Sequence, residues 1–125
     1  MDSMNADSFQ TPQTVSLKGR RFAGVSNSPE GEVDSATVFS YYEEDEMVWA
    51  DYAGGTVRRG FLVGTRSKDS LKFRYCHLSD SGETASGVCT SRIEILSDGR
   101  VRFHESWSWE SRPGTGYSVV EEIRR

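Results

Sequence analysis

The sequence predicts an all-β fold, in which eight antiparallel strands form an up-and-down meander that closes into a small barrel. Two observations lead to this prediction. Short runs rich in β-branched and aromatic residues alternate with turn signals about every 8–12 residues, and no segment has the periodicity of an amphipathic helix. A meander of eight twisted strands usually closes on itself, because closure removes both exposed edges. An open, highly curved sheet is the alternative arrangement of the same strands.

The predicted strands follow one another along most of the chain. Each run is bounded by residues such as Gly, Pro, Asn, Asp and Ser, which favour turns over strands. The runs are RFAGVS (21–26), ATVFSYY (36–42), MVWADYA (47–53), RGFLVGT (59–65), LKFRYCHL (71–78), TASGVCTSRIEIL (84–96), VRFHESWSWE (101–110) and GYSVVEEI (116–123).

Three of the connections carry strong hairpin signals. Gly54-Gly55 suits the positive φ angles of a type I′ turn, and Asp98-Gly99 is the Asp-Gly form of the same signal. In the segment SDSGE, Gly82 stands where a three-residue hairpin loop needs a left-handed residue. Such short turns place consecutive strands side by side, as a meander requires.

The length and composition indicate one domain with an aromatic core. A chain of 125 residues is long enough for one compact core but not for two. Only 35% of the residues are hydrophobic and 11% are aromatic, so rings must supply much of the buried area. Residues 1–17 are polar and have no periodic apolar face. We expect them to form a flexible tail ahead of a single barrel domain at residues 18–125.

Charge and apolar patterning exclude several classes of partner. A net charge of −4 argues against nucleic acid, because binding a phosphate backbone needs clustered positive charge. No apolar run approaches the roughly 18 residues of a transmembrane helix, so no membrane partner is expected. The N-terminus lacks a basic region followed by an apolar one. It is therefore not a secretory signal, and a cytoplasmic location is the expectation.

The two cysteines, Cys76 and Cys89, are predicted to be free thiols. If SDSGE is a tight turn, the cysteines are offset by about three residues across the hairpin, which is too far for a disulfide. Neither CxxC spacing nor a cluster of histidines is present, so no metal and no cofactor are predicted. We interpret Cys89 as a small buried packing residue.

The strand VRFHESWSWE places a carboxylate between aromatic residues on one face. If Asp98-Gly99 forms a two-residue turn, Arg92 lies opposite Glu105, and Trp107 and Trp109 share their face. A bulged three-residue turn shifts the register by one residue and separates Arg92 from Glu105. The sequence leaves both registers open, and the two-residue turn is the working prediction.

Alternation in the other strands assigns more side chains to the interior and leaves one tryptophan outside. The expected interior residues are Phe39, Tyr41, Val48, Ala50, Tyr52, Val57, Phe61, Val63, Leu71, Phe73, Tyr75 and His77. Trp49 then points outward. An exposed aromatic side chain of this kind marks a subunit interface, and a homodimer is the partner arrangement it predicts.

Several segments, taken in order, resemble a family of small bacterial proteins. The resemblance covers residues 19–123, and its most specific pieces are GRVRFHESWSW and YAGG. This chain departs from the family pattern in its EEDE turn, which lacks a glycine, and in its polar N-terminal extension. Members are often labelled N-acetylglutamate synthase, which implies an acetyl-CoA-dependent acetyltransferase.

The residues do not support that acetyltransferase label. Such an enzyme typically grips the cofactor pyrophosphate at a Gly-rich turn that opens a helix. The nearest match, RPGTG at residues 112–116, is one residue short of that loop, and β-sequence follows it.

The leading functional prediction is a barrel that binds a small hydrophobic or aromatic ligand in a partly polar lumen. Tryptophans and tyrosines inside an eight-stranded meander make the arrangement similar to avidin-like and lipocalin-like binders. The predicted ligand-binding residues are Tyr41, Tyr52, Tyr75, His77, Arg92, Glu105, Trp107 and Trp109.

Two alternatives use the same residues. In the first, the rings simply fill a small barrel, and Arg92 neutralises Glu105 as a structural ion pair. In the second, the protein is a small acid–base enzyme of the isomerase, dehydratase or cyclase type, with Glu105 and His77 as the catalytic candidates.

Overall fold

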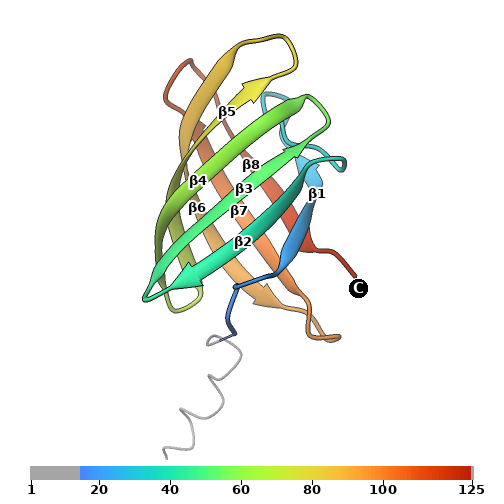
Figure 1. The fold of residues 1–125 in the computed structure, drawn as a ribbon, viewed down its shortest axis with the longest axis vertical. Helices are drawn as coiled ribbons and strands as arrows, with labels where there is room; N and C mark the ends of the chain where they lie inside the picture. Colours follow the sequence, from blue (N-terminus) through green and yellow to red (C-terminus); the bar gives the residue numbers. More distant parts are fainter. Residues whose placement is uncertain (1–14, 125) are drawn as a thin grey trace, which may run out of the picture.

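The computed structural model describes residues 15–124 and shows eight antiparallel strands closed into one barrel (Figure 1). Each strand pairs with its neighbours in sequence, and the last strand returns to pair with the first. The strands are β1 (Arg21–Asn27), β2 (Val38–Glu44), β3 (Met47–Gly54), β4 (Val57–Ser67), β5 (Ser70–Ser79), β6 (Thr84–Ile95), β7 (Val101–Trp109) and β8 (Thr115–Glu122). The predicted up-and-down barrel is therefore confirmed.

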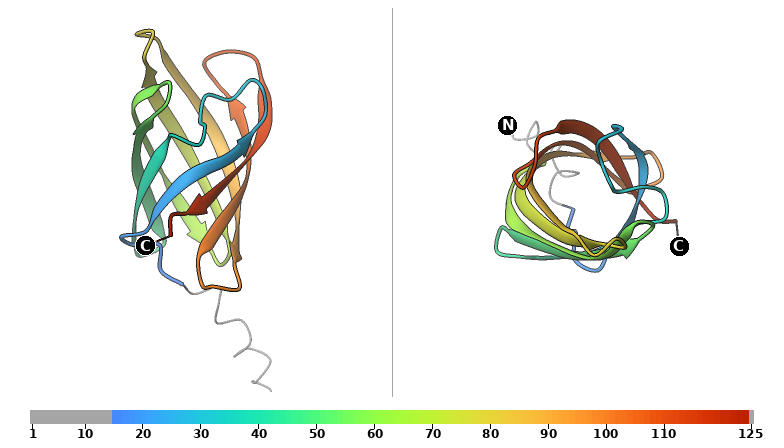
Figure 2. Two further views of the ribbon diagram at one scale, coloured as in Figure 1. Left: turned by 90° about the vertical axis from the view of Figure 1, so that its right-hand side faces the viewer. Right: turned by 90° about the horizontal axis from the view of Figure 1, so that it is seen from above.

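The barrel has two distinct ends. The end-on view shows the strands as a ring around the barrel axis (Figure 2). At one end, which we call the base, the chain enters β1, and the β2–β3, β4–β5 and β6–β7 turns lie nearby (Figure 1). At the other end, which we call the mouth, the longer β1–β2 loop lies beside the β3–β4, β5–β6 and β7–β8 connections.

Aromatic packing fills the barrel toward its base. Phe22 stacks on Phe103 with ring centroids 4.5 Å apart, and Tyr41 contacts each of these rings at 5.1 Å. The three side chains are at most 1% exposed. Close packing of this kind leaves no room for a ligand, so the base is a structural core.

Leu17 belongs to this core, although it falls within residues 1–17, for which we expected a flexible tail. Its side chain is fully buried, and its backbone N–H donates to Glu43 Oε1 at 2.9 Å. Arg66 also holds this segment, because its guanidinium donates to the carbonyl of Val15 at 2.7 Å. The tail prediction for residues 1–14 lies outside the described residues.

The β6–β7 hairpin has the bulged register, so the working prediction of a two-residue turn is wrong. Ser91 lies opposite Glu105, whereas Arg92 lies opposite His104. The turn spans residues 97–99, and Gly99 adopts the left-handed conformation with a φ of 90° that such a turn requires. The shift of one residue turns Arg92 to the outer face and brings its neighbour Ser91 inside.

A bulge in β4 reverses the faces predicted for the rest of that strand. Pairing with β5 shifts by one residue between Val57 and Arg59. Beyond the bulge Leu62 points into the barrel, while Phe61 and Val63 lie outside and are each 56% exposed. The prediction that Phe61 and Val63 belong to the core is therefore wrong, because a bulge exchanges the two faces of a strand.

Trp49 lies on the outer face, as predicted. It stacks on Tyr42 across the β2–β3 pair with ring centroids 5.6 Å apart. Val63 on β4 pairs directly with Trp49, and Phe61 and Met47 are further exposed apolar side chains on these strands. Self-association through this surface stays a prediction.

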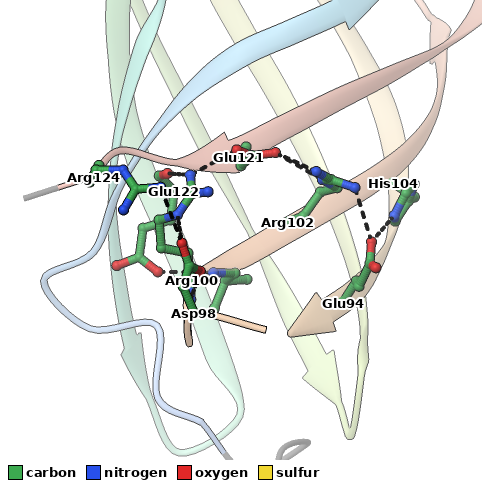
Figure 3. Close-up of polar contacts among 9 residues, drawn as sticks. Glu94, Asp98, Arg100, Arg102, His104, Glu121, Glu122 and Arg124 are labelled. Carbon is green, nitrogen blue, oxygen red and sulfur yellow. Dashed lines mark hydrogen bonds and ion pairs between the residues drawn. The ribbon is translucent and has the colours of Figure 1, made fainter. Parts of the chain in front are cut away.

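Ion pairs join β6, β7 and β8 on the outer face near the base (Figure 3). Glu121 accepts from Arg100 and from Arg102, both at 2.8 Å. His104 lies 2.7 Å from Glu94, so its ring serves this surface network and lies on the side of β7 opposite to the interior.

The structure also describes the two cysteines and the length of any helices. Cys76 is exposed, Cys89 is buried and both are free thiols, as predicted. Between residues 15 and 124 no helix is long and apolar enough to cross a membrane.

Candidate ligand-binding site

A cavity of about 50 Å³ lies inside the barrel toward its mouth. Each of the eight strands and the β1–β2 loop contribute to its wall. One buried water needs about 10–15 Å³, so the cavity has room for a small group of non-hydrogen atoms. The aromatic side chains that line it are Phe39, Tyr52, Phe73, Tyr75, Trp107 and Trp109.

Strand β7 supplies the most distinctive part of the wall. Because alternate side chains of a strand point to the same side, Phe103, Glu105, Trp107 and Trp109 all face inward, in order from base to mouth. Phe103 belongs to the packed base, and the three others line the cavity. The carboxylate of Glu105 therefore lies at the boundary between the packed and the hollow parts of the interior.

Two serines on the neighbouring strands hold the Glu105 carboxylate. Ser91 on β6 and Ser118 on β8 are its direct cross-strand neighbours, and their hydroxyls donate to it at 3.2 Å and 2.9 Å. Burial raises the pKa of Glu105 to about 7, although both hydroxyl groups act to lower it. The accessible surface that Glu105 keeps faces the cavity, since the side chain lies inside the barrel.

Among residues 15–124, no arginine or lysine lines this cavity. Arg92, the predicted ion-pair partner of Glu105, is exposed on the outer face because of the bulged turn. The prediction of a structural Arg92–Glu105 pair is therefore wrong, and so is Arg92 as a lumen residue. An isolated buried carboxylate is costly, and the raised pKa of Glu105 is the expected result.

A second polar feature of the cavity wall is a row of hydrogen bonds that joins Tyr52, His77 and Glu32. The Tyr52 hydroxyl lies 2.9 Å from His77 Nδ1, and His77 Nε2 lies 2.7 Å from Glu32 Oε1. Arg112 pairs with the other oxygen of Glu32 at 2.9 Å. Burial raises the pKa of Glu32, but the hydrogen bonds from His77 and Arg112 outweigh burial and hold it below its usual value. Both ring nitrogens of His77 are thus already engaged.

The β1–β2 loop, residues 28–37, lies at the mouth and contributes Gly31, Glu32 and Val33 to the cavity wall, and we call it the strap. Trp109 Nε1 donates to the carbonyl of Glu30 at 3.1 Å, and Glu32 reaches His77 inside the barrel. Next to the strap, Trp107 Nε1 donates to Asn27 Oδ1 at 3.0 Å. The two tryptophans therefore line the cavity and also hold the end of β1 and the strap that follows it.

Replacing Glu32 with Ala is expected to loosen the strap. The substitution removes the hydrogen bonds to His77 and Arg112, and hydrogen bonds to charged groups contribute about 1.5–3 kcal/mol each. A loss of ~1.4 kcal/mol in the free energy of local opening makes amide hydrogen exchange about tenfold faster. Exchange in residues 28–37 should therefore accelerate at least about tenfold, while exchange in β6 and β7 stays slow.

Glu30→Ala is the matched control. Glu30 holds Trp109 through its backbone carbonyl, and its side chain is exposed. Exchange in the strap should therefore match that of the unmodified protein. Equal protection in the two variants would mean that the Glu32 side chain does not hold the strap.

The structure brings most of the predicted ligand-binding residues together. Those that line the cavity are Tyr52, Tyr75, His77, Glu105, Trp107 and Trp109. Tyr41 lies inside the barrel but in the packed base, and Arg92 lies outside.

Sequence reasoning missed the serines that hold Glu105 and the strap residue Glu32. The bulged register, one of the two alternatives left open, would have placed Ser91 opposite Glu105. No sequence signal identifies Glu32, because its position depends on how an irregular loop folds over the barrel. Within residues 15–124 no group of three or more His, Cys, Asp or Glu side chains could hold a metal ion.

A family model described as "Avidin-like protein" matches residues 15–123, which is most of the chain and the whole barrel. No curated protein and no solved structure matches. The match gives no support to the acetyltransferase label.

Proposed function

Because the chain belongs to the avidin-like protein family, we propose that it is a binding protein that holds one small molecule in the lumen of its barrel. The observation that carries the proposal is the cavity of about 50 Å³ with the Glu105 carboxylate in its wall. Ligand sites typically combine mostly apolar, aromatic walls with a few placed polar groups.

The alternative, in which the aromatic rings only fill the barrel, explains the packed base better than it explains the cavity near the mouth. Packing explains the base, where Phe22, Tyr41 and Phe103 are in close contact. It does not explain why a carboxylate without a cationic partner in the cavity wall faces empty space. Burying such a group without a partner costs free energy, which is typical of a functional site rather than of a core.

The size of the cavity limits the ligand that this structure can hold. The avidin-like family binds small ligands such as biotin, whose bicyclic ring and carboxyalkyl chain exceed a cavity of about 50 Å³. A ligand of that size requires the cavity to widen, whereas a molecule of a few non-hydrogen atoms fits the cavity as it stands.

Acid–base catalysis is a second candidate function, and the pKa of Glu105 favours it. A carboxyl group with a pKa of about 7 exchanges its proton readily at neutral pH, which suits a general acid or base. The other catalytic candidate, His77, has both ring nitrogens in hydrogen bonds to Tyr52 and Glu32. Turnover of a bound molecule that stops in Glu105→Gln, with binding retained, would establish catalysis.

The binding proposal is tested by filling the cavity. Cys89 lines the cavity and is buried, so Cys89→Leu places additional carbon atoms in the open space. We expect the purified protein to retain a small molecule in native mass spectrometry, and the variant to lose it while melting cooperatively. The same substitution at the other cysteine, Cys76→Leu, lies on the outside and should change nothing.

Two results would contradict small-molecule binding. One is the absence of any retained molecule, combined with no thermal shift from a broad ligand screen. The other is equal retention by the Cys89→Leu and Cys76→Leu variants, because it would place the molecule outside the lumen.

A further inference from the structure

In the part of the chain that the structure describes, the charges around the cavity leave one carboxylate without a counter-ion. Glu32 is already paired with His77 and Arg112 at 2.7 Å and 2.9 Å. Glu105 receives only two hydroxyl groups, from Ser91 and Ser118. A carboxylate offers about four lone-pair positions, so Glu105 can accept further hydrogen bonds from a guest in the cavity.

His77 on β5 also lines the cavity, but its imidazole is paired with Glu32. The other ionisable groups that face Glu105 from the strands carry no positive charge. They are Tyr41 on β2, Tyr52 on β3, Tyr75 on β5 and Cys89 on β6. Burial above all, together with the negative charge of Glu105, raises the pKa of each of these groups, so all four stay neutral near pH 7. The cavity wall from β1, β4 and β8, which consists of Asn27, Leu62 and Ser118, contains no ionisable group.

The aromatic rings near Glu105 meet at steep angles. Trp107 and Trp109 have ring centroids 5.5 Å apart and planes inclined by 60°, and Tyr75 meets Trp109 at 63°. All three rings line the cavity. Walls inclined in this way partly surround a guest, and ring faces attract cations through their quadrupoles. The Arg112 guanidinium, which pairs with Glu32, already lies 4.3 Å from the centroid of the Trp109 ring, so Trp107 is the tryptophan that remains for a guest.

We propose that the cavity binds a small organic cation, such as a guanidinium or a short alkylammonium, with its charge on the Glu105 carboxylate and a face against the ring of Trp107. This inference rests on the proposed function of small-molecule binding and names the ligand class. The cation supplies the counter-ion that the barrel lacks in the cavity. An anion of the same size would meet the charge of Glu105 with no lysine or arginine in the cavity wall.

Binding of a cation is then coupled to ionisation of Glu105. Only the ionised carboxylate carries the charge that the guest neutralises, so the apparent affinity scales with the ionised fraction. With a pKa of about 7, that fraction is ~0.9 at pH 8 and ~0.01 at pH 5. The apparent affinity should therefore fall roughly a hundredfold between these two pH values.

Three probes of equal size test the ligand class. Guanidinium, urea and acetate have non-hydrogen atoms in the same planar arrangement. Guanidinium is positively charged, urea is neutral and acetate is negatively charged. The readout is the shift of the tryptophan indole N–H signals in NMR spectra, with Trp49 on the outer face as an internal reference. We expect guanidinium to shift the Trp107 and Trp109 signals at pH 8 with at least tenfold higher affinity than urea or acetate, and Trp49 to stay unchanged.

Two variants identify the carboxylate. Glu105→Gln keeps the shape and should weaken guanidinium binding at least tenfold and abolish its pH dependence. Glu110→Gln removes an exposed carboxylate, 42% accessible, that pairs with Arg74 on the outer face, and should leave binding unchanged. Tetramethylammonium separates the contribution of charge from that of hydrogen bonding. It keeps the positive charge and the contact with ring faces but donates no hydrogen bond to Glu105.

The outcomes separate this inference from the proposed function. Equal affinities for the three probes, or undiminished guanidinium binding by Glu105→Gln, would overturn the cation inference. If no probe binds but a retained neutral or anionic molecule is lost in Cys89→Leu, the cation inference fails and small-molecule binding stands. If no probe binds and no molecule is retained, both fail.

Discussion

Glu105→Gln is expected to stabilise the protein by about 3 kcal/mol at pH 8.5 and to have a much smaller effect below pH 4.5. The reason is that burial raises the pKa of Glu105 from its ordinary 4.5 to about 7 in the folded barrel. At ~1.4 kcal/mol for each pH unit, this difference amounts to ~3 kcal/mol between the two ionisation states. Gln removes the charge and keeps a group that can accept from Ser91 or Ser118.

The sign follows from comparing the folded and unfolded chains. A carboxyl group whose pKa is higher in the folded state binds its proton more tightly there, so protonation stabilises the fold. That contribution is fully present below pH 4.5, is lost as the pH rises toward 7, and is absent above about 7. The difference between Glu105→Gln and the unmodified protein should therefore open between these pH values and then remain constant.

Denaturant unfolding at several pH values measures this difference directly. Each kcal/mol corresponds to roughly 4 °C in the melting temperature of a domain of this size, so ~3 kcal/mol is readily detected by melting as well. Glu110→Gln controls for the loss of one negative charge, because its exposed pair with Arg74 contributes little. A constant difference at all pH values would show that the pKa of Glu105 is not raised by folding.

The fold was predictable because its signals are local. Turn residues such as Gly82 and Gly99 mark the hairpins, and both have the positive φ angles that such turns need. Alternation then places Tyr52, Tyr75 and His77 inside without any knowledge of the rest of the chain. Eight strands joined in sequence leave closure as the simplest way to remove the two edges.

The charge balance of the site was not predictable because it depends on whether the pairing of β6 with β7 is shifted by one residue. Asp98-Gly99 is compatible with both a two-residue and a three-residue turn, and the choice decides whether Arg92 or Ser91 faces Glu105. The bulge in β4 is a similar case, since nothing in RRGFLVG marks where the faces of the strand exchange. Local patterns identify which residue types lie near one another, and turn and bulge geometry decides which of them meet.

Phe103→Ala is expected to destabilise the barrel by about 4 kcal/mol. Phe103 is fully buried and stacks on Phe22 at 4.5 Å, with Tyr41 packed against both rings. Removing a buried phenyl ring typically costs about 3–5 kcal/mol, because the lost burial is followed by a cavity that the surroundings fill only in part. Denaturant unfolding should show a lower midpoint with an unchanged slope.

Phe73→Ala is the informative comparison because Phe73 lines the existing cavity and keeps 8% exposure. Its ring already has empty space on one side and makes fewer contacts there, so its removal should cost less than that of Phe103, by at least ~1 kcal/mol. Equal costs would mean that the interior is packed uniformly from base to mouth, in which case the aromatic side chains around Glu105 would be core and not a binding site. A smaller cost at Phe73, combined with loss of the retained molecule in Cys89→Leu, would divide the barrel into a base that maintains the fold and a mouth that is free to bind.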